Sequence, residues 1–259
     1  MLTYYQTQLA GLLQNPGAPT SLYSTTDLNR WINAARGQVA GESKAIRYLG
    51  SLSTVIGQRN YNFSGISTGV AATTGIQGVI HVRSVMYAVA SGYQWMRPRP
   101  WEWFTLYKLN NPVPVSGPPE VWSQFGQGSA GAGSITGIGT GTMISGSIYI
   151  DPPPDLVYTL QLDCVCYPIL LTADTDVEAL PYLWTDSVPF FAAYYALLSA
   201  QSSARVADAE RMYNYYQEFV RRARNAANPD VNSYLYQQSN DPVKINKLGL
   251  QKAAAGGGQ

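Results

Sequence analysis

The sequence predicts an α+β protein in which a β domain is inserted between helical segments from the two ends of the chain. Apolar residues recur at helical spacing near both ends, whereas a strand-like pattern fills the middle. The stretch after residue 228 shows neither period. We therefore expect a helical bundle built from residues 1–48 and 172–227, an inserted antiparallel β barrel or sandwich over residues 49–171, and an extended C-terminal arm over residues 228–259.

Two helices are predicted before residue 48. In the first, the apolar side chains on one face are Leu2, Tyr5, Leu9, Leu12 and Leu13, and Pro16-Gly17 ends the segment. The second follows Ser24–Asp27, whose side-chain oxygens can cap a helix N-terminus. Its apolar residues keep the helical spacing: Leu28, Trp31, Ile32, Ala35 and Val39.

A β pattern runs from about Leu49 to Leu171. The predicted strands are a turn-rich pair around Val55, Tyr61 and Phe63, a long strand at Val79–Tyr87, a strand at Ser147–Ile150, and the longest strand signal at Leu156–Leu171. Between them, Pro100 introduces a short predicted helix at Trp101–Leu109, and Asp151–Asp155 is expected to form a turn.

The last third returns to a helical pattern. Asp186 is placed to cap a segment that has Pro189 in its first turn. Two apolar stripes follow, Phe190, Tyr194 and Leu197, then Met212, Tyr216, Phe219 and Ala223. Because Ala200–Ala209 between the stripes is weakly apolar, we expect a bend or break there. The cations of the last turn suit the negative end of the helix macrodipole: Arg221, Arg222 and Arg224.

The composition favours wide contact with neighbouring molecules. Charged residues make up 13% of the 259 residues, against about 25% in ordinary soluble domains. Tyr is the clearest excess, with 19 residues, and interfaces favour Tyr because it provides a large contact area at low entropic cost. We therefore expect the chain to work as one copy in a larger assembly.

Charge is unevenly distributed, although the net charge is only +1. No Lys or Arg occurs from Leu109 to Ala204, a stretch that holds eight of the 16 acids, so all 17 bases lie elsewhere with the other eight. Such asymmetry bears on partners rather than on the fold. We expect the acid-only stretch and the basic remainder of the chain to face different partners. Chance segregation is the alternative.

The cysteines and the apolar runs favour a cytosolic chain. Cys164 and Cys166 lie two apart in a predicted strand, so both point to one face and are poorly placed to bond each other. We expect both to be reduced and structural. The first base is Arg30, so the charged start of a signal peptide is lacking. The longest uncharged run, Ser187–Ala204, has a second half too polar to span a membrane.

The sequence offers only weak candidates for catalysis or zinc binding. His81, the only histidine, lies between apolar residues of a predicted strand and has no nucleophile motif beside it, so a structural role is expected. A zinc site needs three or four nitrogen or sulfur ligands, and the chain has only three such residues, one histidine and two cysteines, with no CxxC motif. We predict no catalytic residue, no cofactor and no metal.

Two local patterns suggest ligands but have simpler interpretations. Gly126–Gly131 matches GxGxxG, yet the Gly-rich residues that follow are unsuited to the helix that dinucleotide binding requires, so we expect a Gly-rich loop or hairpin tip. Asp174, Asp176 and Glu178 suggest calcium, but the Gly and the bidentate Glu of an EF-hand loop are missing. Capping and turn formation before the next helix are expected there instead.

Several segments occur in an order that is found in one family. The segments are Asp27–Arg36, Val39–Ser43, Gly57–Phe63, Ile148–Asp155, the strand through Tyr167-Pro168, and Leu171–Pro181. They resemble phage head-to-tail adaptor proteins of short-tailed phages. The likeness covers residues 1 to about 227 and rests on pattern and order, whereas the Gly126–Gly146 loop is unusually long and Gly-rich for it.

The resemblance implies a fold and a function together. In that family a helical bundle with a β insertion forms a dodecameric ring below the portal, joins the portal to the tail nozzle and lets the genome DNA pass. The chain is accordingly expected to be non-enzymatic. In such a ring, the acids of Leu109–Ala204 are expected either to line the channel, so that DNA slides without sticking, or to meet the bases of a neighbouring copy. It is expected to be assembled in the host cytoplasm and located in the virion neck, without sequence-specific DNA binding and without a membrane partner.

Two alternative functions remain open. A minor tail or fibre protein could bind host-surface carbohydrate through Trp101 and Trp103, near Phe104 and Tyr107, although such aromatics also serve as core. An exposed aromatic platform would favour this alternative, and buried tryptophans would count against it. A wall hydrolase would need Glu102 or Glu120 opposite another acid across a cleft.

The C-terminal arm supplies the predicted partner-binding residues. It ends in Ala-Ala-Ala-Gly-Gly-Gly-Gln, and ordering such a backbone costs about 1–2 kcal/mol per residue, so we expect another chain to hold it. The predicted anchors are Tyr234, Tyr236, Val243, Ile245, Leu248 and Leu250. The resemblance points to the portal as that chain, since related adaptors wrap C-terminal arms around it. A neighbouring copy is the alternative.

Overall fold

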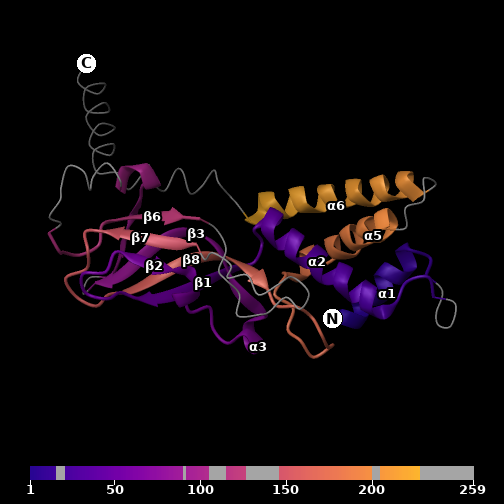
Figure 1. The fold of residues 1–259 in the computed structure, drawn as a ribbon, viewed down its shortest axis with the longest axis horizontal. Coiled ribbons are helices and arrows are strands. Elements are labelled where there is room, and N and C mark those ends of the chain that lie inside the picture. The colour runs from indigo at the N-terminus through magenta and orange to yellow at the C-terminus, as the bar shows by residue number, and fades with distance from the viewer. Residues whose placement is uncertain (16–20, 90–91, 105–114, 127–145, 200–204, 228–259) are drawn as a thin grey trace, which may run out of the picture.

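The helices α1, α2, α5 and α6 gather at one end of an elongated molecule, and two β-sheets form the other end (Figure 1). The computed structural model describes residues 1–15, 21–89, 92–104, 115–126, 146–199 and 205–227. The predicted α+β class is therefore confirmed, with helices from both ends of the chain packed together. The arm predicted over residues 228–259 lies outside the described residues.

The helices begin and end close to the predicted positions. Their bounds are α1 Leu2–Leu12, α2 Thr25–Ser43, α3 Ala71–Thr74, α5 Ser187–Ser199 and α6 Val206–Ala227. The Ser24 side chain caps α2 by accepting a hydrogen bond of 3.1 Å from the Asp27 backbone N–H. The predicted break after residue 199 is confirmed, because α5 and α6 are separate helices. Residues 101–104 are also helical, in the predicted place.

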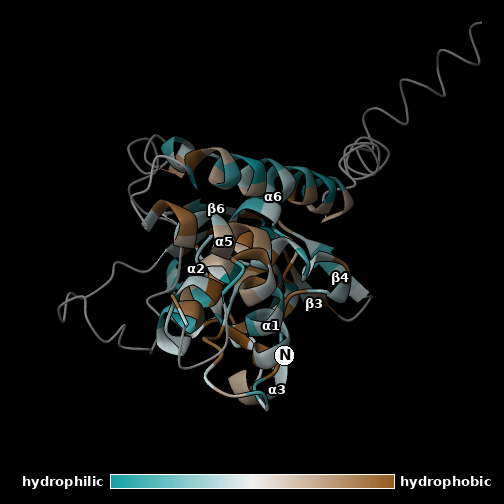
Figure 2. Cartoon of the chain, turned by 90° about the vertical axis from the view of Figure 1, so that its right-hand side faces the viewer, coloured by the Kyte–Doolittle hydropathy of each residue, from teal (hydrophilic) through white to brown (hydrophobic). Residues whose placement is uncertain are grey.

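The packing of α5 differs from the predicted stripe. Phe190 and Tyr194 are only half-buried, whereas Val188, Phe191 and Ala192 are fully or almost fully buried. The reason is that α5 contacts α1, α2 and α6, so most of its circumference is covered and one stripe cannot describe it. Figure 2 shows α6 lying outermost, with a hydrophilic outer surface.

Two four-stranded sheets make up the β part. The first has the order β1-β8-β3-β4, and all its pairs are antiparallel. Its strands are β1 Arg47–Ser53, β8 Thr159–Pro168, β3 Ile76–Val89 and β4 Gly92–Trp95. The second has the order β2-β7-β6-β5. Its strands are β2 Asn60–Asn62, β7 Ser147–Asp151, β6 Val121–Phe125 and β5 Arg97–Pro98.

Three strand predictions need correction. The pair β5–β6 is parallel, so the sheets are not purely antiparallel. The expected strand pair around residues 55–63 does not form, because β1 pairs with β8 in one sheet and β2 pairs with β7 in the other. The longest strand is β3, with 14 residues against 10 in β8. In addition, β6 was not predicted.

One cluster of buried side chains runs from the helices into both sheets. It includes Leu9 of α1, Ile32 of α2, Leu162 of β8 and Ile148 of β7. The helices and sheets also approach closely at Gly37 of α2, which is buried, since a Cβ there would lie 2.6 Å from the Tyr167 hydroxyl oxygen of β8. The division into residues 1–48 with 172–227 and residues 49–171 stays a prediction.

Candidate interaction surfaces

A buried ion pair fixes the segment that follows β8 to the helices. The Nε and Nη2 nitrogens of Arg36 on α2 donate hydrogen bonds of 2.8 Å to the two carboxylate oxygens of Glu178. The two side chains are only 1% and 6% exposed. The Nη1 nitrogen of Arg36 also donates to the Ile169 carbonyl at 2.6 Å. The two parallel hydrogen bonds compensate for the free energy that both charged groups lose when they are removed from water.

Neighbouring polar groups complete this network. The Tyr5 hydroxyl of α1 donates to Glu178 at 2.9 Å, and burial together with that carboxylate raises the pKa of Tyr5. The Asn33 amide spans the Leu171 backbone, donating to its carbonyl at 3.0 Å and accepting from its N–H at 2.8 Å. The network therefore holds α1, α2 and the segment after β8 in one arrangement.

The acids first considered for calcium bind backbone groups, but Asp174 caps α1 and not the next helix along the chain. Asp174 accepts hydrogen bonds from the Thr3 backbone N–H at 2.8 Å and from the Met1 amino group at 3.2 Å, which caps the start of α1. Asp176 accepts from the backbone N–H groups of Thr172 and Ala173 and forms a turn. Across the described ranges, no group of three His, Cys, Asp or Glu side chains is placed to hold a metal ion.

The same segment presents acidic and apolar side chains to solvent. Residues 170–186 contain no Lys or Arg. Carboxylates that are at least partly exposed and large exposed apolar groups lie together here, and we name them the acidic loop surface: Tyr4, Asp174, Asp176, Tyr182, Leu183 and Asp186. Tyr182 is 83% exposed and Leu183 is 73% exposed. The Tyr4 hydroxyl donates to Asp186 at 3.0 Å, which joins α1 to this surface.

Basic side chains gather where α6 ends against the sheets. We name them the basic junction patch: Lys44, Arg47, Arg83, Arg221, Arg222 and Arg224. Arg83 of β3 donates to the Ala227 carbonyl at the end of α6 at 3.1 Å. Arg224 donates to the Glu42 carbonyl near the end of α2 at 3.0 Å. Each contact places a cation at the negative end of a helix dipole.

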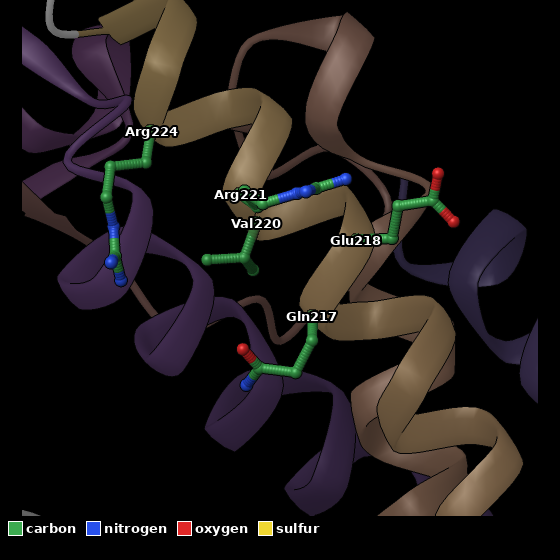
Figure 3. A pocket seen from close by; sticks show the side chains of 5 residues that line it. All are labelled: Gln217, Glu218, Val220, Arg221 and Arg224. Atoms are coloured by element: carbon green, nitrogen blue, oxygen red, sulfur yellow. The ribbon is translucent and has the colours of Figure 1, made fainter.

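A hollow of about 480 Å³ lies along α6 within this patch. Figure 3 shows Arg224 and Gln217 pointing toward α2, while Arg221 and Glu218 extend from the other side of α6. Arg222 pairs with Glu218 one turn earlier, and all three arginines of α6 in the patch are exposed. The hollow thus offers guanidinium and amide donors to a partner with acceptor groups.

A family model described as SU10 adaptor protein matches residues 5–242. The chain belongs to the SU10 adaptor protein family. It is therefore a phage adaptor, a structural protein, and the predicted resemblance is confirmed. A search of curated proteins found no match for the chain.

Part of the charge asymmetry along the sequence of this adaptor is neutralised by ion pairs within the chain. Three acids of the stretch without bases pair with arginines outside it: Asp151 with Arg59, Asp163 with Arg47, and Glu178 with Arg36. The expectation that the acids face a channel or a neighbour is wrong for Asp151 and Glu178, which are buried and paired within the chain. Folding brings together acids and bases that are far apart in the sequence, because strands without bases pack against segments that contain arginines. Five other acids of the stretch remain exposed at least in part: Glu120, Asp155, Asp174, Asp176 and Asp186.

The histidine and the two cysteines lie within strands of the adaptor. His81 is half-buried on β3, and burial lowers its pKa, with further lowering from Lys44 and Arg83. Cys164 and Cys166 are free, buried neighbours on β8, as predicted. Burial raises the pKa of both thiols to about 12.

The carbohydrate and hydrolase alternatives gain no support from the described residues. Trp101 is half-buried and packs against Tyr149 with a ring separation of 4.2 Å, which fits the core interpretation. Trp103 is also half-buried. Glu102 and Glu120 are both exposed, and neither lines the hollow on α6 or the second hollow, of about 570 Å³, beside α2 and α5.

Three predictions fall partly or wholly on residues outside the described ranges. These are the six anchors of the arm, most of the Gly-rich segment after Gly126, and Tyr107 of the proposed aromatic platform. Gly126 itself is described and has a φ of +74°. Among the helices that the structure describes, none combines the length and apolar character of a membrane span.

Proposed function

We propose that this adaptor forms a ring that joins the portal of a phage head to the tail and lets DNA pass. The family match over residues 5–242 carries the proposal, because the match includes the helices, both sheets and the start of the arm. The resemblance implies a dodecamer, with the portal above the ring and the tail nozzle below it. A location in the virion neck, after assembly in the host cytoplasm, follows from the same arrangement.

The surface of the chain supports repeated contact with other proteins. Charge is scarce, and large apolar side chains are exposed at Tyr182 and Leu183, in the segment that the Arg36–Glu178 pair holds against α2. Exposed apolar groups held by a buried network are pre-organised for docking, since little conformational entropy is lost when a partner covers them. This is the character expected of an assembly subunit.

We also propose that residues 228–259 bind the portal as an extended arm. Tyr and aliphatic residues spaced along a segment without helical period can lie in a partner's groove or add to its sheet edge. The predicted anchors Tyr234, Tyr236, Val243, Ile245, Leu248 and Leu250 would supply the buried contacts. The helical bundle of residues 1–48 and 172–227 would then act with the β domain of residues 49–171 as the body of the ring.

Co-sedimentation with purified portal rings tests the proposed function. The full chain is expected to sediment with portal rings in a fixed ratio, and electron microscopy should show a second ring with an open central channel. A chain that stays in the supernatant at every portal concentration would count against an adaptor of the portal.

A further inference from the structure

The strand β4 forms an edge of the first sheet, and among the described strands it pairs only with β3. Figure 2 shows it beside β3 at one side of the molecule. Met96, directly after β4, donates from its backbone N–H to the Val85 carbonyl at 2.9 Å. Bonded and non-bonded positions alternate along an antiparallel pair, so Tyr93 and Trp95 direct their backbone N–H and C=O groups away from β3, toward the edge.

The other sheet edges are short or closed. Ser67 closes part of the edge of β1 by exchanging backbone hydrogen bonds of 3.0 and 2.8 Å with Ser51. The strand β2 has three residues, and β5 has two, of which Pro98 lacks a backbone N–H. Such features keep sheet edges from pairing with further strands. Because β4 contains neither Pro nor a charged residue, its edge can accept another strand.

Two large aromatic side chains lie at this edge. Tyr93 is 56% exposed and Trp95 is 61% exposed, and residues two apart in a strand share one face of the sheet. The Tyr93 hydroxyl accepts a hydrogen bond of 3.3 Å from Gln161 of β8. Since Leu160 and Leu162 on either side of Gln161 are buried, this face is the solvent side of the sheet. Exposed Tyr and Trp are typical of binding hot spots.

The C-terminal arm begins close to this edge. Arg83 of β3 donates to the carbonyl of Ala227, the last residue of α6, at 3.1 Å. Trp95 is opposite Met86, which lies three positions beyond Arg83, or roughly 10 Å along β3. A strand added to β4 would lie two strand spacings, roughly 10 Å, to the side of β3. An extended chain gains about 3.3–3.6 Å per residue, so the arm can reach this edge within about five residues.

The sequence and the direction of the arm both suit this edge. Val231–Tyr236 is rich in Val, Leu and Tyr, and it follows Asn228-Pro229-Asp230, which is typical of a turn. The strand β3 runs from Arg83 toward Val89, and β4 returns in the opposite direction. An arm that leaves the end of α6 beside Arg83 and follows β3 toward Val89 is therefore antiparallel to β4.

We propose that residues 231–236 add to the free edge of β4 as a further strand of the sheet in their own chain. This goes beyond the proposed function, because it concerns how the arm is held before any partner is present. The arm of the same chain is favoured over that of a neighbouring copy, since a short connection gives it a high effective concentration at this edge.

Strand addition is compatible with the proposed binding of the portal. Backbone hydrogen bonds hold the segment, while Tyr234 and Tyr236, two apart, keep both rings on one face of the sheet. An arm that is ordered in advance loses less conformational entropy when the portal covers it. The edge of β4 thereby prepares the first part of the arm for docking.

Hydrogen exchange of the full chain and of a chain that ends at Asn228 tests the proposal, with residue resolution by mass spectrometry. The amides of Tyr93 and Trp95 are expected to exchange roughly tenfold or more slowly in the full chain, because only there do they meet acceptors. The amide of Met96, which is bonded to Val85, should be slow in both chains. Equal exchange of Tyr93 and Trp95 in the two chains would overturn the proposal, whether another strand or none occupies the edge.

A pair of prolines in the arm tests the backbone pairing without changing the body of the fold. Tyr234→Pro/Leu235→Pro removes two adjacent N–H groups, so one is lost from the pairing in either register. Tyr234→Ala/Leu235→Ala is the matched control, because it removes the same side chains and keeps both N–H groups. The Pro pair should give the fast exchange of the shortened chain, and the Ala pair the slow exchange of the full chain. Slow exchange in the Pro pair, or fast exchange in both variants, would contradict strand pairing.

Mixing decides which chain supplies the strand. The chain that ends at Asn228, isotopically labelled, is mixed with unlabelled full chain, and its Tyr93 and Trp95 amides should remain fast. Slow exchange in the labelled chain would mean that a neighbour supplies the strand, and it would overturn the proposal. Portal binding is measured separately. A full chain with a protected β4 edge that never binds portal rings would count against the proposed function alone, whereas an unprotected edge in a chain that binds them would overturn this proposal alone.

Discussion

Arg36 and Glu178 are 142 positions apart in the sequence, yet two hydrogen bonds of 2.8 Å join them in the interior. Glu178→Ala would leave the Arg36 guanidinium buried without its partner, so we expect the free energy of unfolding to fall by about 3–5 kcal/mol. Urea denaturation measures this loss. The exposed pair of Glu218 with Arg222 is the control, because Glu218→Ala should cost about 0–1 kcal/mol. Equal small losses for both variants would show that the buried pair has no special role.

Gly75 is expected to tolerate no side chain. Its φ is +67°, and an added Cβ would lie 2.6 Å from the Val177 carbonyl oxygen, which is backbone and cannot move aside cheaply. Gly57 has a similar φ of +77° but open space around the Cβ position. Gly75→Ala should therefore lower the melting temperature clearly more than Gly57→Ala. If both variants lose the same amount, the close approach to Val177 carries no energetic weight.

The capping of α1 by Asp174 predicts a dependence on pH. Hydrogen bonds from Thr3 and the N-terminal amino group lower the pKa of Asp174 from 3.8 to about 2. The stabilising contribution is fully present above the unfolded pKa of 3.8 and is lost as the pH falls through the folded pKa of about 2. Asp174→Asn should therefore flatten the loss of thermal stability between pH 4 and pH 2. Glu210→Gln on the exposed surface of α6 is the control, and it should leave that slope unchanged.

The two cysteines should be inert in the folded protein. Burial raises the pKa of Cys164 and Cys166 to about 12, so almost no thiolate forms near neutral pH, and the sulfur atoms are shielded. A maleimide reagent is expected to label neither thiol in native buffer and both after unfolding in urea. Leu183→Cys provides an exposed reference thiol. Ser at either native position should leave assembly intact, and rapid native labelling would contradict this account.

Removal of the arm tests its proposed role. A chain that ends at Asn228 keeps every residue of α6, so we expect it to fold and remain soluble. It should fail to dock on portal rings, because the anchors from Tyr234 to Leu250 are gone. Circular dichroism controls for the fold, and co-sedimentation measures docking. Unchanged affinity of the shortened chain would mean that the arm is not the anchor.

Local patterns in the sequence predict much of the fold because they depend on neighbouring residues. The spacing from Leu28 to Val39 and the capping oxygen of Ser24 lie within α2 itself, and both appear as expected. Strand pairing depends instead on distant residues. Leu49 of β1 is opposite Asp163 of β8, so nothing near Leu49 reveals that β1 and β2 belong to different sheets.

The candidate surfaces were harder to predict, for the same reason. The sequence marked Asp174, Asp176 and Glu178 as an acidic cluster. Only the partners of Asp176 lie nearby, whereas Thr3, which bonds Asp174, and Arg36, which bonds Glu178, come from the first helices of the chain. The basic junction patch combines α6 with the ends of α2 and β3, which no single stretch contains. A signal was present in the tyrosine content and in the base-free stretch. These features of the sequence could indicate a subunit of an assembly, but they could not indicate which surfaces of the subunit contact its partners.

The mass of the assembled particle tests the central claim most directly. Native mass spectrometry of the full chain, alone and with portal rings, measures the number of copies without labels. We expect a closed ring, with twelve times the mass of one chain in the dodecamer that the resemblance implies, and we expect that ring to add to the portal as a unit. A chain that remains monomeric under both conditions would contradict the account of this protein as a ring-forming adaptor.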